Sequence, residues 1–154
     1  MSLVVAFVTL ATAINGLLAG LNVDTALVKL PARHRIGAAA YTAFARGNDL
    51  GNGLIFYPVL GISAALLTVI VTALAFVTQS RAEVLLLLSL ASLLSLLHTF
   101  ATTRAAPTML SLNAATQDHA LVRAKLVRFA RWHTMRALFQ VPVFFLLLWT
   151  LAVL

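Results

Sequence analysis

The sequence contains no cysteine and little charge, and these two shortages exclude several classes of protein. Without cysteine there is no disulfide, no thiolate metal site and no cysteine nucleophile. Only 10% of the residues are charged, against about 25% in soluble domains. No stretch resembles a P-loop, a dinucleotide-binding fingerprint or a nucleophile elbow. A soluble nucleotide-binding or cysteine-dependent enzyme is therefore not expected.

Long hydrophobic runs take the place of the missing charge. Of the 154 residues, 62% are hydrophobic, and the mean hydropathy is +1.00. A helix needs about 20 apolar residues to cross the hydrocarbon core of a bilayer. Four segments meet or approach that length, at about 3–23, 54–77, 84–103 and 137–154. We therefore predict an all-α, polytopic membrane four-helix bundle that forms a single domain over residues 1–154. An amphipathic helical segment that starts near Gln117 leads into the fourth span.

The positive charge is distributed unevenly between the connections of these spans. Of the eleven Lys and Arg residues, ten lie in the segments that join the first span to the second and the third to the fourth. The positive-inside rule places these segments in the cytoplasm and both termini outside. The expected location is the bacterial inner membrane. The net charge of +7 then indicates contact with anionic membrane lipids, not nucleic acid, because the basic residues are not interleaved with exposed aromatics.

Polar side chains gather near the cytoplasmic ends of the predicted spans. Such groups are costly in hydrocarbon and mark candidate functional sites. The predicted site is a pocket with apolar walls in the cytoplasmic half of the bundle. Its candidate catalytic residues are His98, His133 and Arg136. Its candidate ligand-binding residues are Asn15, Asn22, Asp49, Asn52, Tyr57, Arg104 and Trp132.

Simpler roles exist for several of these residues. Arg104 and Arg136 have the stems to extend their charges to lipid phosphates, and Trp132 and Tyr57 suit an interfacial aromatic belt. Asn22 has the chemistry of an interhelical hydrogen bond. His98 is the hardest to explain in this way, because an imidazole in a leucine-rich span needs polar partners. No metal site is predicted, since carboxylates are few and no two histidines have helical ligand spacing.

The C-terminal third carries a motif similar to one in a known family. The stretch F-A-R-W-H-T-M-R-A-L, from Phe129 to Leu138, resembles the small four-helix membrane proteins of the anthrone oxygenase-like family. The segment from Gly16 to Pro31, with its Leu-Pro pair, looks like the end of that family's first helix. The resemblance implies oxidation of anthrones to anthraquinones by O2 without a conventional cofactor, with Trp132, His133 and Arg136 in the shared polar site. The chain departs from the family where Thr103 and Arg104 replace an expected asparagine, although Pro107 is retained.

Three functional hypotheses follow. The first is a membrane-embedded oxygenase or oxidoreductase-like enzyme that binds an apolar aromatic or lipid-like molecule and needs no cofactor. His98 or His133 would be its base, and Arg136 or Arg104 would stabilise the anion. The second is a haem carrier with His98 and His133 as ligands. The third is a non-catalytic small subunit or lipid-binding module; the GxxxG spacing of Gly16 and Gly20 is also compatible with a homo-oligomer.

Overall fold

The computed structural model describes residues 3–113 and 119–154, and their regular structure is entirely helical. The expected all-α fold class is therefore confirmed. The elements in chain order are α1 (Leu3–Asp24), η1 (Thr25–Lys29), α2 (Leu30–Gly47), η2 (Asn48–Asn52), α3 (Gly53–Val77), α4 (Ala82–Leu110), η3 (Ser111–Asn113) and α5 (His119–Val153). The elements η1 and η2 are π-helical turns, and η3 is a single 3₁₀ turn.

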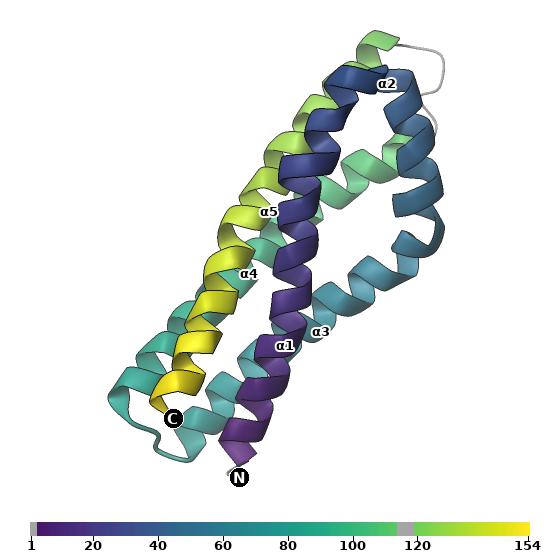
Figure 1. Cartoon of the computed structure of the whole chain (residues 1–154). Coiled ribbons are helices and arrows are strands. Elements are labelled where there is room, and N and C mark those ends of the chain that lie inside the picture. Colours follow the sequence, from purple (N-terminus) through teal and green to yellow (C-terminus); the bar gives the residue numbers. More distant parts are fainter. Residues whose placement is uncertain (1–2, 114–118) are drawn as a thin grey trace.

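Three helical stretches are long and apolar enough to cross a membrane: Leu3–Val77, Ala82–Leu110 and Ala120–Val153. The first contains both predicted segments 3–23 and 54–77, because helical structure continues between them. Gly37 (φ 82°) and Gly51 (ψ −121°) have non-helical backbone in this connection, and the chain turns back on itself there (Figure 1). Glycine is favoured at position 37 in particular, since residues with a side chain rarely adopt a positive φ.

The last two helices extend beyond the predicted spans. Helix α4 continues past residue 103 through Pro107 to Leu110. Helix α5 runs without interruption from His119 to Val153, so the predicted amphipathic segment and the fourth span form one helix. The predicted start near Gln117 lies outside the described residues. Both helices are therefore longer than a bilayer core requires, by several turns in the case of α5.

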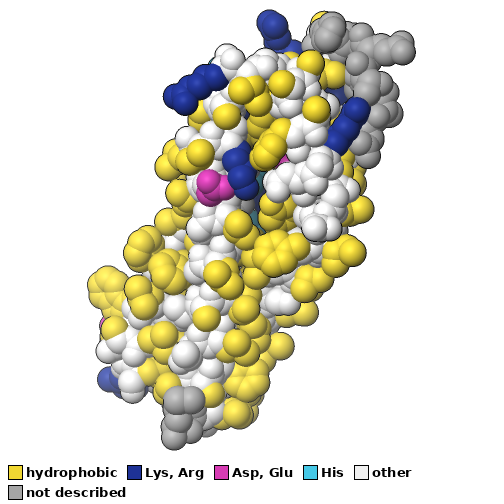
Figure 2. All heavy atoms as spheres, turned by 45° about the vertical axis from the view of Figure 1, so that its right-hand side comes forward, with side chains coloured by type: hydrophobic (Ala, Val, Ile, Leu, Met, Phe, Trp, Pro, Cys, Tyr) yellow, Lys and Arg dark blue, Asp and Glu magenta, His cyan; other side chains and the backbone are white. Residues whose placement is uncertain are grey.

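The four long helices pack side by side. Helix α1 contacts α3 and α5, and α4 contacts α3 and α5. Both chain ends and the α3–α4 turn lie at one end of the molecule, and α2 lies at the other (Figure 1). On the face drawn in Figure 2, most Lys and Arg side chains are at the α2 end. The fold thus separates the basic connections from the termini, as the charge pattern predicts.

Helix α1 buries a row of residues spaced alternately four and three apart. The row consists of Val4, Val8, Ala11, Asn15, Leu18 and Asn22. This heptad spacing is typical of helices that pack by interlocking side chains at a shallow crossing angle. The two asparagines are therefore part of the packing row, not of the outer surface of the bundle.

Helix α5 presents one buried row to α1 and another to α4. Gln140 and His133 form hydrogen bonds to Asn15 and Asn22 of α1, and the backbone of Arg136 accepts one from His98 of α4. Apolar clusters lie on both sides of these polar levels. One contains Val8, Leu88, Ala91, Val143 and Leu147, and the other contains Leu30, Tyr41, Ala105, Leu126 and Phe129. The polar residues thus form a layer within an otherwise apolar interior.

Candidate functional site

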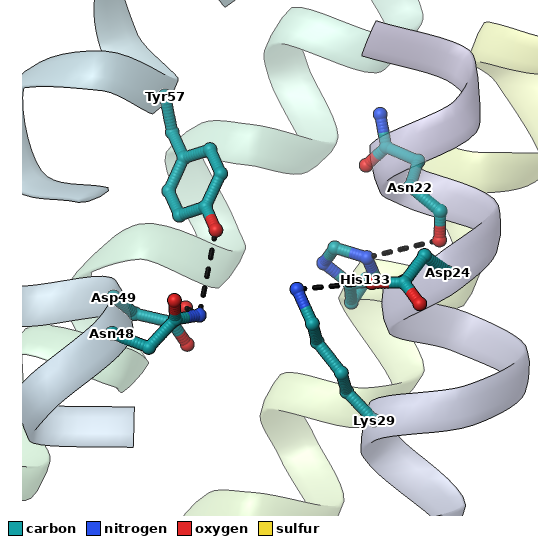
Figure 3. A network of polar contacts seen from close by, with 7 residues as sticks. All are labelled: Asn22, Asp24, Lys29, Asn48, Asp49, Tyr57 and His133. Carbon is teal, nitrogen blue, oxygen red and sulfur yellow. Dashed lines mark hydrogen bonds and ion pairs between the residues drawn. The ribbon is translucent and has the colours of Figure 1, made fainter. Parts of the chain in front are cut away.

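Side chains from five elements converge at the level of Asn22 and His133. Asn22 and Asp24 come from α1, Lys29 from η1, Asn48 and Asp49 from η2, Tyr57 from α3 and His133 from α5 (Figure 3). Tyr57, Asn48 and Asp49 lie on one side, and their polar atoms face Lys29 and His133 on the other. Together with Arg136, these residues are called the inner polar cluster below.

The surface beside this cluster is open on one face. Figure 2 shows a narrow opening next to a basic and an acidic side chain that touch each other, with a histidine side chain inside it. Lys29 and Asp24 form such a pair, with 2.9 Å between Nζ and Oδ2. The inner polar cluster therefore lies close to the molecular surface at the Lys29–Asp24 ion pair.

Asp49 is one of the two carboxylates of the cluster, the other being Asp24. Asn48 donates a hydrogen bond of 2.8 Å from Nδ2 to Oδ1 of Asp49, and its Nδ2 lies 3.5 Å from the Tyr57 hydroxyl. Burial raises the pKa of Asp49, although the Asn48 hydrogen bond and the charges of Lys29 and Arg136 act in the opposite direction. Asp49 thus lies within electrostatic reach of both cations.

His133 has one nitrogen fixed and the other unused. Its Nε2 is 3.4 Å from the backbone oxygen of Asn22. A carbonyl oxygen only accepts, so the proton is on Nε2 and the lone pair is on Nδ1. That Nδ1 is buried and has no hydrogen-bond partner among residues 3–113 and 119–154. His133 therefore offers a proton acceptor inside the bundle.

Arg136 lies on the next turn of the same helix, and its Nε–H is likewise buried with no partner in the described part of the chain. Residues three apart on a helix are neighbours. A buried polar atom without a partner costs about 1–3 kcal/mol, and such atoms in native structures call for a specific explanation. An acceptor beside a cationic donor is suited to a ligand that supplies a proton and an oxygen anion.

His98 approaches this pair from α4. It is buried at 3% exposure, and its Nδ1 donates a 3.2 Å hydrogen bond to the backbone oxygen of Arg136. The lone pair of His98 is consequently on Nε2. This contact fixes the level of His98 against Arg136 and supplies the polar partner that a histidine in a leucine-rich helix needs.

A second polar level lies two turns deeper. Asn15 accepts a 2.8 Å hydrogen bond on Oδ1 from Nε2 of Gln140, and it donates from Nδ2 to Oγ1 of Thr68 at 3.1 Å. All three side chains are fully buried, at 0% exposure. Oε1 of Gln140 is buried without a partner among the described residues. Asn15 therefore links α1, α3 and α5 below the inner polar cluster.

Three predicted site residues lie apart from the cluster. Asn52 is exposed at the end of η2. Arg104 is exposed, with its guanidinium carbon 5.3 Å from the centre of the Phe100 ring. Trp132 meets the same ring edge to face, with 6.3 Å between centroids. Arg104 and Trp132 therefore belong to the outer surface of α4 and α5.

Three cluster residues, Asp24, Lys29 and Asn48, and Gln140 of the second polar level were not among the predicted site residues. In the sequence, Lys29 served only to assign the topology by the positive-inside rule. Asn48 was passed over in favour of its neighbour Asp49. Gln140 follows His133 by seven residues in an apolar span. That heptad spacing is the signal that could have identified Gln140, because it puts both side chains on one face of the helix.

The cation of Arg136 beside the two histidines favours an anionic group over a metal ion at that point of the cluster. The positive charge of Arg136 acts on both His98 and His133. No group of three or more His, Cys, Asp or Glu side chains suited to a metal ion occurs in the described ranges. A haem iron would have to be coordinated by Nε2 of His98 and Nδ1 of His133, because the other ring nitrogens are hydrogen-bonded to backbone oxygens. A base next to a cation suits proton removal from an acidic organic molecule more directly.

Comparison with known proteins gives no match to this chain among family models, curated proteins or solved structures.

Proposed function

We propose that this chain is an integral membrane protein whose helices α1, α3, α4 and α5 each cross the bilayer as a four-helix bundle. The three apolar stretches support membrane insertion. The shared end of both termini and the α3–α4 turn supports an even number of crossings (Figure 1). Ten of the eleven Lys and Arg residues belong to the connections at the opposite end, which the positive-inside rule assigns to the cytoplasm.

The proposed ligand is an apolar aromatic or lipid-like molecule with one acidic C–H or O–H group. The observation that carries this proposal is the pair formed by the His133 Nδ1 and the Arg136 Nε–H, both buried and both without partners in the described residues. The acidic group would lie between them, and the apolar remainder would pack on the neighbouring cluster of Leu18, Leu60 and Ala64. Lys29 and Tyr57 face the same space.

The proposed reaction is the cofactor-free oxidation carried out by enzymes of the anthrone oxygenase-like family, which the Phe129–Leu138 stretch resembles. His133 accepts the acidic proton of an anthrone, and Arg136 stabilises the resulting enolate oxygen. The enolate gives one electron to O2, and the resulting radical and superoxide combine to a peroxide anion. This anion takes the proton back from His133 and becomes a hydroperoxide. Loss of water then yields the quinone, so that one anthrone and one O2 give one anthraquinone and one H2O.

Oxygen uptake by the purified protein in mild detergent, with anthrone as the substrate, tests this proposal. The expected result is quinone formation above the spontaneous rate with one O2 consumed per quinone. His133→Gln and Arg136→Gln should each lower the protein-dependent rate by about 100-fold or more, the usual effect of losing a general base or an anion stabiliser.

Arg128→Gln is the matched control, because Arg128 is an exposed residue of the same helix. It removes one positive charge outside the cluster and should retain full activity. Unchanged rates in both cluster variants would refute the proposed site. If anthrone bound in a His133-dependent way without turnover, the site would be a binding site and the oxygenase assignment would be wrong.

A further inference from the structure

Two hollows follow one another along the outer seam between α4 and α5. The first, of about 350 Å³, is bordered by three cationic side chains, Arg104, Lys125 and Arg128. The second, of about 240 Å³, is bordered mostly by apolar side chains, among them Leu97, Phe100, Trp132 and Phe139, and by one cation, Arg131. Neither hollow includes a residue of the inner polar cluster, so the seam is a separate feature of the surface.

The first hollow carries a concentration of positive charge. No carboxylate in the described residues forms an ion pair with Arg104, Lys125 or Arg128. Lys125 donates one of its three ammonium protons to the backbone oxygen of Ser111, at 3.2 Å. The other two have no partner within residues 3–113 and 119–154. Hydroxyl groups of Thr103, Thr108 and Ser111 complete the border. Each of these hydroxyls donates its hydrogen to a backbone oxygen. Arginine and lysine, the typical ligands of phosphate, are therefore the donors that this hollow offers.

The two hollows are joined by one aromatic residue. The Arg104 guanidinium covers the Phe100 ring at 5.3 Å, and Trp132 touches another part of that ring. Phe100 therefore lies at the boundary between the cationic hollow and the apolar one. Along α4 the order is Leu97, Phe100, then Arg104, so the apolar hollow lies toward the interior of the proposed membrane and the cationic hollow toward its cytoplasmic surface.

We infer that this seam binds one anionic membrane phospholipid, with its phosphate among Arg104, Lys125 and Arg128 and an acyl chain along Phe100 and Phe139. A free phosphate would use only the first hollow, and a neutral lipid only the second. The succession of the two hollows matches a molecule that has both parts. Trp132 and Arg104 at their junction have the chemistry of residues that settle at the lipid headgroup level.

Native mass spectrometry of the purified protein tests this inference, with dioleoyl phosphatidylglycerol and dioleoyl phosphatidylcholine supplied at equal concentration. The expected result is one retained phosphatidylglycerol and little phosphatidylcholine. In Arg104→Gln/Arg128→Gln, phosphatidylglycerol retention should fall by about tenfold or more, given the usual contribution of two basic residues near a membrane surface. Leu97→Trp, which fills the apolar hollow, should lower retention without changing the charge.

The matched control is Arg35→Gln/Arg123→Gln. It removes the same charge from exposed positions outside the seam and should retain the lipid. An equal loss in this control would show a general charge effect and overturn the site, as would wild-type retention in Arg104→Gln/Arg128→Gln. Displacement of the lipid by millimolar inorganic phosphate would show a free-anion site and overturn the phospholipid assignment. Anthrone oxidation is measured separately, so failure of one proposal leaves the other standing.

Discussion

His133 and Arg136 show how a single hydrogen bond determines what a side chain can do. The carbonyl of Asn22 takes the Nε2 proton of His133, which leaves a buried lone pair on Nδ1. The backbone oxygen of Arg136 accepts a hydrogen bond from His98, and the side-chain Nε–H has no partner in the described residues. The two residues therefore present an acceptor and a cationic donor on adjacent turns, and the contact with Asn22 is what leaves the acceptor free.

The buried pair of Asn15 and Gln140 gives a test of polar packing between α1 and α5. Gln140→Leu removes the 2.8 Å donor to Oδ1 of Asn15 and should destabilise the protein by about 1 kcal/mol, the usual size of such contacts in membrane proteins. Asn15→Leu should have a similar effect. The double variant Asn15→Leu/Gln140→Leu should lose less unfolding free energy than the sum of the two single losses, because neither amide is then left unpaired.

Thermal unfolding midpoints in detergent measure these differences. Thr134→Ala is the control, since Thr134 is exposed on α5 and bonds only within its own helix. Strict additivity of the two single variants would mean that the Asn15–Gln140 contact does not couple the helices.

The junction of η2 and α3 depends on the absence of a side chain at Gly53. A Cβ there would lie 2.6 Å from the backbone oxygen of Asn48 and 2.6 Å from the Tyr57 ring. Gly53 has ordinary helical backbone (φ −60°, ψ −26°), so its role is close packing, not unusual conformation. This contact lets Asn48 and Tyr57 approach each other at the edge of the inner polar cluster.

Gly53→Ala should therefore destabilise the protein by about 1–3 kcal/mol through overpacking, and it should weaken ligand binding at the cluster. Gly61→Ala, on the same helix, meets nothing within 4 Å and should be neutral or stabilising by up to about 1 kcal/mol, because alanine favours helix. Unfolding midpoints of the two variants give the comparison. A Gly53→Ala protein as stable as Gly61→Ala would contradict the packing argument.

The extra length of α4 and α5 explains where the two proposed sites lie. Helix α5 continues through the level of His133 and Arg128 to His119, and α4 continues past Arg104 to Leu110. Cations at this end of the two helices therefore lie on regular helical faces. Ridges of side chains from two regular helices form a seam with fixed hollows, which irregular connections would not provide.

The arrangement of the whole chain predicts which of its ends can be reached from outside the cell. The protein has no native cysteine, so single cysteines can be introduced without background. Ala82→Cys, at the exposed start of α4, should react with a membrane-impermeant maleimide on intact cells. Ala39→Cys, exposed in α2 at the opposite end, should react only after permeabilisation. The reverse pattern would invert the proposed topology.

Sequence patterns identified some residues of the inner polar cluster but not the full set. Asn22, Asp49, Tyr57, His133 and Arg136 were predicted and do lie near one another. Asn52, Arg104 and Trp132 have the same chemistry and lie elsewhere. Position along a span gives the depth of a residue, whereas the direction of its side chain depends on how each helix is rotated against its neighbours. Lys29 turns inward for the same reason, although its charge alone suggested an exposed connection.

The sequence by itself determined the helical class, the hydrophobic stretches and the division of charge between the two ends, because each of these follows from local composition. It also determined that Asn15 and Asn22 share a face, since helical periodicity depends only on spacing. The tertiary structure alone decided that Gln140 meets Asn15, that His133 gives its Nε2 proton to Asn22, and that Arg104 turns outward to Phe100. These contacts join residues up to 125 positions apart, and only the packing of antiparallel helices fixes which of them meet.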